Sequence, residues 1–313
     1  MNKCPFCYQT TENAYHPSCC KKMFGTTELP QLTLNKKLLD ELANSTVNQR
    51  IAVTGVQPKL SVEIEDVKGE GKRLTIVGLW GNYILKPQHT HFEQMPEVED
   101  LTMHLASIFK ITTCKHCLLK ASDGTYVYLA KRFDRKNGKK IHMEDFCQLG
   151  EFQTEQKYNS SYERCGKLIY KYCTNSGLDV VNYFELLLFS FLTGNNDMHM
   201  KNFSVLHQNG EISLAPAYDL INANLLNPKD IEDLAMTFNG RKRKIARKDF
   251  DAVADTLKIP EVTVSRLIKK YTEGKEKVFS LIDLSYLSQE FKDEYKKIWV
   301  EKIGRLYNYQ KEK

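Results

Sequence analysis

The chain contains 313 residues, of which 42% are hydrophobic and 27% are charged, and its formal net charge at pH 7 is +6. This composition excludes an intrinsically disordered chain, and the length is enough for one large domain or two lobes with a sizeable core. The most apolar run, residues 180–194, is too short to span a membrane, and the first residues lack the pattern of a signal peptide. We therefore expect a cytoplasmic protein that does not contact membranes.

Residues 1–30 form a Cys-rich head. The chain has nine cysteines, an odd number at irregular spacing, which favours reduced thiols or a metal over a disulfide framework. Cys4, Cys7, His16 and Cys19 follow the pattern C-x2-C-x8-H-x2-C, and three sulfurs with one imidazole suit tetrahedral zinc. The two halves are closer together than in common zinc modules, so a zinc site and a small reduced Cys/His knuckle are both open.

Residues 31–135 are predicted to form a β-rich lobe. A helix and a polar linker come first, at residues 31–50. Alternating or clustered β-formers between glycine-containing turns then predict strands, and helical spacing of apolar residues after Pro96 predicts one helix. The expected strands are residues 60–65, 74–79, 83–85, 117–120 and 126–133, and the helix is residues 96–109.

Residues 136–313 are predicted to form a helical lobe. Apolar residues recur there at helical spacing, and the expected helices are residues 162–173, 179–193, 247–257, 260–271 and 289–307. Strands first and helices later indicate an α/β (α+β) chain with two lobes.

Asp197 and Asn202 are the most informative pair of residues. A protein kinase needs a carboxylate to accept the proton of the substrate hydroxyl and, five positions later, a side-chain oxygen to hold magnesium. A second metal-binding acid should follow, and Asp219 comes after a predicted hairpin. Asp and Asn in such a turn are often only turn formers. The ordered set of helix, acid, Asn, hairpin and acid favours catalysis.

Lys86 ends the predicted strand 83–85, where its amine can reach nucleotide phosphates, with Glu97 or Glu99 of the next helix as its partner. From the position alone, an exposed lysine at a strand end is an equally good interpretation. Residues 54–61 could cover the phosphates with backbone N–H groups, although a single glycine matches neither G-x-G-x-x-G nor the P-loop pattern.

Together these segments resemble the HipA family of serine/threonine kinase toxins, and they follow that family's order over most of the chain. The resemblance implies a two-lobed protein-kinase-like fold of the HipA type that uses ATP and magnesium. The matching segments are residues 54–61 (glycine-rich loop), 83–87 (lysine strand), 96–99 (start of the regulatory helix), 131–135 (hinge), 144–148 (the segment after the hinge), 196–203 (catalytic loop) and 215–220 (metal segment).

The resemblance also implies roles for single residues. Asp197 is the base, accompanied by Lys201 as a catalytic residue, and Asn202 and Asp219 are the magnesium ligands. Lys86 is the phosphate lysine, with Glu99 as its partner. The remaining nucleotide-binding residues implied in this way are Thr54, Gly55, Val56, Gln57, Lys59, Lys131, Phe133, Asp134, Gln148 and His199.

Two departures from the family matter. Full-length HipA proteins carry a small subdomain ahead of the kinase core, whereas here the glycine-rich loop begins near residue 52. The chain is therefore more similar to HipT, the short kinase of three-component systems, whose partners are HipS and the DNA-binding antitoxin HipB. The family's autophosphorylated serine falls at Ala52, and Thr54 is the nearest hydroxyl and the candidate autophosphorylation site.

The implied function is that of a toxin in a type II toxin-antitoxin system. The family's targets are aminoacyl-tRNA synthetases, so the result would be arrested translation. A small-molecule phosphotransferase, with its similar loop, and a pseudokinase scaffold or corepressor are the alternatives, and the intact kinase residues count against a pseudokinase. The basic stretch 239–248 is interpreted as a solvated surface, and DNA is expected only indirectly, through a partner.

Overall fold

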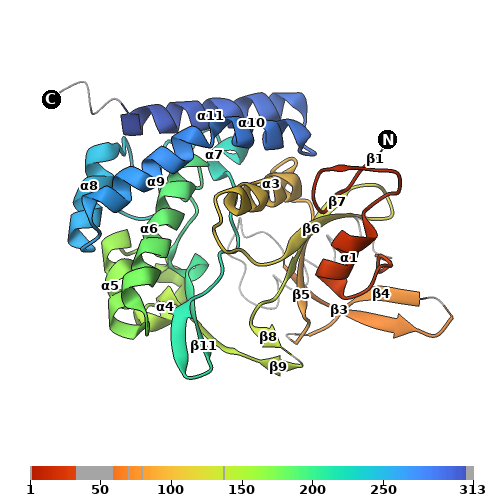
Figure 1. The fold of residues 1–313 in the computed structure, drawn as a ribbon. Helices are drawn as coiled ribbons and strands as arrows, with labels where there is room; N and C mark the ends of the chain where they lie inside the picture. Colours follow the sequence, from red (N-terminus) through yellow and green to blue (C-terminus); the bar gives the residue numbers. More distant parts are fainter. Residues whose placement is uncertain (1, 33–58, 70, 79, 137, 308–313) are drawn as a thin grey trace. The chain divides into compact units, whose positions relative to one another are not determined.

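A computed structural model gives the structure of the chain, and it describes residues 2–32, 59–69, 71–78, 80–136 and 138–307 (Figure 1). The chain divides into two compact units. Unit 1 comprises residues 1–104, 114–133 and 284–287, and unit 2 comprises residues 105–113, 134–283 and 288–313.

Unit 1 is built on a five-stranded antiparallel sheet with the strand order β4-β3-β5-β7-β6. Tight turns with left-handed glycines join neighbouring strands, as at Gly69 and Gly71 (φ +86° and +81°) and at Gly124 (φ +85°). The elements are β1 (Asn2–Lys3), β2 (Thr10–Thr11), α1 (Pro17–Phe24), β3 (Leu60–Val67), β4 (Gly71–Ile76), β5 (Tyr83–Lys86), α3 (Met95–Ile108), β6 (His116–Lys120) and β7 (Tyr126–Lys131).

The two faces of this sheet carry different partners, because successive side chains of a strand point to opposite faces. Leu85 and Cys117 belong to the buried cluster that also contains Cys20, Met23 and Phe24 of the Cys-rich head. The neighbouring residues Lys86 and His116 instead bond to the carboxylates of α3. The head therefore covers one face of the sheet, and α3 lies on the other.

Unit 2 is mainly helical and has α6 at its centre. The second half of α6, residues 186–192, is almost entirely apolar and buried, and the helix packs against α5 and α11 (Figure 1). The elements are β8 (Arg135–Lys136), β9 (Lys139–Lys140), β10 (His142–Asp145), α4 (Phe146–Leu149), η1 (Thr154–Gln156), α5 (Tyr162–Tyr172), α6 (Ser176–Leu192), η2 (Met200–Asn202), β11 (Ser204–Gln208), β12 (Glu211–Leu214), α7 (Ala223–Leu226), α8 (Arg247–Thr256), α9 (Glu261–Glu273), α10 (Lys275–Leu284) and α11 (Gln289–Tyr307).

The predicted α/β class is confirmed, and each predicted helix and strand that falls on described residues is present within a few residues of its expected bounds. Several bounds differ by two or three residues, among them those of two strands. The strand expected at 74–79 is residues 71–76, because polar pairs such as Asp66 and Lys72 extend the hairpin beyond its alternating part. The strand expected to reach residue 133 ends at Lys131.

Other elements were missed by the sequence patterns. Residues 142–145 were expected within a helical region, yet they form β10, which pairs with β11 in a three-stranded sheet. This strand is poor in β-formers, so its partner strand and not its own propensity determines it. The helices α1 and α10 were missed as well.

The helix expected at 31–50 and the candidate loop residues 52–58 lie largely outside the described residues. Among the residues that the structure describes, no helix is long and apolar enough to cross a bilayer.

Candidate phosphoryl-transfer site

The end of α6 places the loop that carries Asp197. Helix α6 stops at Leu192, and Gly194 follows with a left-handed φ of +68°. A Cβ atom at this position would come within 2.7 Å of Asn222 Oδ1, so both the conformation and the close approach require glycine. The Asn195 backbone N–H donates to the Ser190 carbonyl (2.8 Å), which turns the chain sharply back over the end of the helix.

Asp197 is exposed, whereas residues 191–196 before it and 198–200 after it are buried. The loop thus presents one carboxylate to its surroundings from an otherwise packed segment. The Tyr158 hydroxyl donates to Asp197 Oδ1 at 2.6 Å and fixes the orientation of the carboxylate. Burial, followed by the charge of Asp197, raises the pKa of Tyr158 above its usual range, so this hydroxyl keeps its proton and stays a donor.

Asn202 is buried one turn later, in η2. Its amide nitrogen donates to the carbonyl oxygen of Asp197 at 3.1 Å, which closes the loop on itself. Because the nitrogen is used in this way, the amide oxygen Oδ1 points away from that carbonyl. An amide oxygen is a suitable ligand for magnesium.

Asp219 follows β12 and has a left-handed φ of +60°, a conformation that Asp tolerates better than most residues. The preceding Tyr218 ties this segment to the catalytic loop, because its hydroxyl donates to the Lys201 carbonyl (2.8 Å) and bonds to Ser204 Oγ (2.6 Å). The negative charges of Asp197 and Asp219 both act on Tyr158. Unit 2 therefore brings the predicted base and both predicted magnesium ligands into one region.

Lys201 lies beside this loop, and its Nζ forms an ion pair with Asp145 Oδ2 at 2.8 Å. Asp145 is also the N-cap of α4 and forms a capping box with Gln148. The Asp145 carboxylate accepts from the Gln148 backbone N–H, and the Gln148 side chain accepts from the Asp145 backbone N–H. The predicted nucleotide-binding residue Gln148 is exposed and has this capping contact. His199 is buried, with its ring edge-to-face against Tyr158.

Unit 1 contains the predicted lysine pair. Lys86 Nζ and Glu99 Oε1 are 2.5 Å apart, and both side chains are at most 5% exposed. Lys86 also lies over the Tyr128 ring at 5.4 Å. Glu97, the other carboxylate considered from the sequence, is buried on the same helix, and this burial raises its pKa to about 7. Glu99 is thus the partner that the fold provides for Lys86.

The predicted hinge residues lie where the chain passes from unit 1 to unit 2, between Phe133 and Asp134. Lys131 ends β7, and its Nζ donates to the Met23 carbonyl at 3.1 Å. Asp134 is buried and pairs with Arg135 at 2.5 Å. Of the predicted phosphate loop, Lys59 is exposed just before β3, whereas Thr54, Gly55, Val56 and Gln57 lie outside the described residues.

The four candidate zinc ligands are brought together in the head of unit 1. The sulfurs of Cys4, Cys7 and Cys19 and one ring nitrogen of His16 all lie within 4.8 Å of one another. These residues come from two separate segments, a tight turn after β1 and the start of α1.

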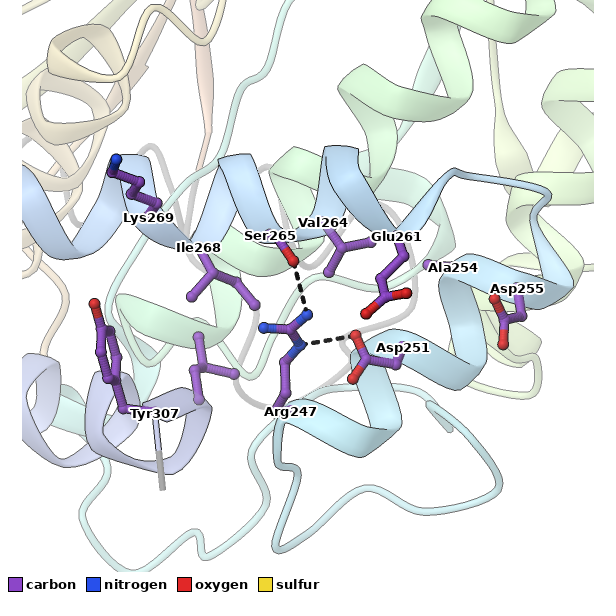
Figure 2. A pocket seen from close by; sticks show the side chains of 11 residues that line it. Arg247, Asp251, Ala254, Asp255, Glu261, Val264, Ser265, Ile268, Lys269 and Tyr307 are labelled. Atoms are coloured by element: carbon purple, nitrogen blue, oxygen red, sulfur yellow. Dashed lines mark hydrogen bonds and ion pairs between the residues drawn. The ribbon is translucent and has the colours of Figure 1, made fainter. Parts of the chain in front are cut away.

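A pocket of about 680 Å³ lies elsewhere in unit 2, among α8, α9 and the end of α11 (Figure 2). Arg247 reaches into it and is already satisfied there, because its guanidinium bonds to Asp251 (2.7 Å) and Ser265 (3.1 Å). None of the predicted site residues lines this pocket.

Sequence reasoning missed three residues that support the site: Tyr158, Asp145 and Tyr218. Tyr158 and Asp145 are separated from their partners by 39 and 56 residues. No local pattern marks Tyr158, which only the tertiary fold brings to the loop. Asp145 lies in segment 144–148, whose resemblance to the family was noted without a role for this residue. Tyr218 had one available signal, its position directly before the metal-segment acid.

Comparison with known proteins identifies the family. The profile of the HipA-like C-terminal domain matches residues 51–279, which is most of the chain and includes both the lysine pair and the catalytic loop. The chain belongs to the HipA-like C-terminal domain family.

The individual relatives have low sequence identity to this chain. A Haemophilus influenzae protein to which kinase activity is ascribed is 25% identical over 287 residues, covering 82% of this chain and 82% of the relative. The serine/threonine-protein kinase toxin HipA of Shewanella oneidensis is 28% identical over 214 residues, covering 61% of this chain and 47% of the toxin. The chain thus spans about half the length of that toxin.

Two solved structures share the fold. Shewanella oneidensis HipA, in its complex with HipB and operator DNA, has a TM-score of 0.69 at 24% identity, covering 84% of this chain and 66% of that chain. The Helicobacter pylori proinflammatory kinase CtkA has a TM-score of 0.51 at 15% identity, covering 72% of this chain and 88% of that chain. The predicted likeness to HipA-type kinases is confirmed at the level of the fold.

Proposed function

We propose that this chain is an ATP- and magnesium-dependent kinase that phosphorylates serine or threonine on a protein, and that it acts in the cytoplasm as a toxin of a type II toxin-antitoxin system. One observation carries this proposal. Asp197 is the exposed residue of a buried loop, and the same loop holds Asn202 and is tied through Tyr218 to the segment of Asp219. A kinase needs these three groups together.

Each of these side chains has a specific role in the proposed phosphoryl transfer. Asp197 accepts the proton of the substrate hydroxyl, and the Tyr158 hydroxyl keeps its carboxylate oriented. Asn202 and Asp219 offer the oxygen ligands that suit magnesium, which, when bound, neutralises charge on the transferred phosphate. Lys201 adds a positive charge beside the loop.

The residues of unit 1 bind the nucleotide in this proposal. Lys86, held by Glu99, contacts the α and β phosphates. The segment from Thr54 to Lys59 supplies backbone donors for the phosphates, and phosphorylation of Thr54 would oppose that contact by like-charge repulsion. Lys131 ends β7, and Phe133 and Asp134 follow it in the hinge segment where the chain passes from unit 1 to unit 2. The backbone of this segment would hold adenine.

The proposed target and partners follow from the family. We place an aminoacyl-tRNA synthetase first among protein targets, and HipS-like and HipB-like antitoxins among partners. The Shewanella oneidensis structure contains HipA together with HipB and operator DNA, which supports a HipB-like partner that would bring this chain near DNA. The stretch 239–248 is mostly exposed, in keeping with a solvated surface.

Incubating the purified chain with γ-labelled ATP, magnesium and a heat-treated cell lysate tests the substrate class. We expect label on serine or threonine of one dominant protein, and none with the Asp219→Asn variant. Label in a new acid-soluble compound other than ATP and phosphate, with none on protein, would instead indicate a small-molecule phosphotransferase. No transfer to either fraction would favour a pseudokinase scaffold or corepressor.

A further inference from the structure

The four residues Cys4, Cys7, His16 and Cys19 converge as the ligands of one small cation would. Their ligand atoms lie within 4.8 Å of one another, and Cys7 Sγ is 3.4 Å from His16 Nδ1. Around a tetrahedral zinc ion with Zn–S of about 2.3 Å and Zn–N of about 2.0–2.1 Å, ligand atoms are roughly 3.5–3.8 Å apart. The side chains therefore need only a small contraction to enclose zinc.

The second nitrogen of His16 supports the same assignment. Nε2 lies 3.1 Å from the Thr10 carbonyl oxygen, which can only accept, so Nε2 carries the hydrogen and Nδ1 presents a lone pair toward Cys7. Zinc-binding histidines make this kind of outer bond to fix their tautomer. The His16 backbone N–H also donates to Cys4 Sγ at 3.3 Å, which ties the two halves of the cluster together.

Neighbouring groups are excluded as ligands by their own contacts. The Cys20 thiol donates to the Glu28 carbonyl at 3.2 Å. In the nearby group of Asp100, His104 and His116, Asp100 accepts from the His116 ring at 2.6 Å, and His104 Nε2 lies 3.5 Å from the same carboxylate. Three thiolates and one imidazole select zinc over magnesium or calcium, which prefer oxygen.

Tyr8 connects this cluster to α3. It directly follows Cys7 and has a left-handed φ of +61°, which is unusual for a bulky side chain. Its N–H closes the turn onto the Cys4 carbonyl (2.9 Å), and its buried hydroxyl donates to Asp100 Oδ2 at 2.6 Å. Asp100 is the neighbour of Glu99, the partner of Lys86.

We infer that Cys4, Cys7, His16 and Cys19 bind one structural zinc ion, and that this ion holds Tyr8 in the conformation that positions α3 and its Glu99. The metal site stands independently of the kinase assignment, whereas the positioning role of Tyr8 rests on the proposed function. Tyr8 is a positioning residue, because it acts on Lys86 only through Asp100 and Glu99.

The metal site is tested by zinc analysis of the full chain purified without chelators. We expect about one zinc per chain in the wild type and in Cys20→Ala, and at most about 0.2 in Cys19→Ala. Because unfolding of Cys19→Ala would also release the metal, chelated wild-type chain is titrated with cobalt(II) as well, which should give the visible absorption of a tetrahedral thiolate complex. Fewer than about 0.2 zinc ions per chain in the wild type, with no cobalt spectrum, would overturn the site. Equal loss of zinc in Cys20→Ala and Cys19→Ala would overturn it as well.

The positioning role is tested with two hydroxyl deletions in the same head. Tyr8→Phe removes the bond to Asp100, whereas Tyr15→Phe removes only a bond from the Leu29 backbone N–H. Both should keep their zinc. Affinity for ATP with magnesium should fall roughly 10- to 100-fold in Tyr8→Phe, the size expected for a lost bond to a carboxylate, and less than about twofold in Tyr15→Phe.

The outcomes separate the two parts of the inference. Unchanged ATP affinity in zinc-loaded Tyr8→Phe would overturn the positioning role and leave the metal site. Wild-type chain that binds zinc but no ATP would contradict the proposed function and, with it, the positioning role, while again supporting the metal site.

Discussion

Replacing Asp197 with Asn is expected to lower the rate of phosphoryl transfer by about 10²- to 10⁴-fold, the usual contribution of a positioned proton acceptor. The amide keeps the shape of the side chain and the oxygen to which the Tyr158 hydroxyl donates. Asp197 is exposed, so the loop should keep its fold. Transfer of label from ATP to protein is the measurement, with thermal unfolding of the same sample as a check.

Asp123→Asn is the matched control for this variant, because Asp123 is an exposed turn residue that accepts from the Thr125 backbone N–H. It should transfer phosphate at the wild-type rate. Asp197→Asn with a rate within tenfold of the wild type, at unchanged stability, would show that the carboxylate is not the base.

Replacing Lys86 with Met is expected to reduce transfer to below about 1% of the wild-type rate, since it removes a preorganised charge from the phosphate site. It should also destabilise the protein by roughly 3–5 kcal/mol, because Glu99 is then left buried without its partner. These two effects have different origins. Denaturant unfolding and transfer assays measure them separately.

The double variant Lys86→Met/Glu99→Gln distinguishes structure from function. It removes both charges of the buried pair, so most of the lost stability should return. Transfer should stay as low as in the single variant, because nothing replaces the ammonium at the phosphates. Recovery of transfer together with stability would mean that the pair only supports the fold.

The catalytic loop could be predicted because its chemistry demands fixed residue types at a short, fixed spacing. Asp197 and Asn202 are five residues apart, and the loop fold keeps them in contact. The Lys86–Glu99 pair, although its members are only 13 residues apart, was predicted through the family resemblance. Its position in the sequence alone left both the role of Lys86 and the choice between Glu97 and Glu99 open.

Contacts over long sequence separations could not be predicted in this way. Tyr8 reaches Asp100 across 92 residues, and its left-handed backbone gives no sequence signal. β10 is a strand only because β11 pairs with it. In both cases the tertiary fold imposes a conformation that the residues themselves do not favour.

Equilibrium binding of ATP to the purified chain, with and without magnesium, tests the central claim most directly because it needs no knowledge of the target. We predict that the wild type binds ATP more tightly with magnesium than without it. The ratio of these two affinities should be at least tenfold smaller in Asp219→Asn. Equal ATP affinity with and without magnesium in the wild type, or an unchanged gain in Asp219→Asn, would contradict the assignment of this site.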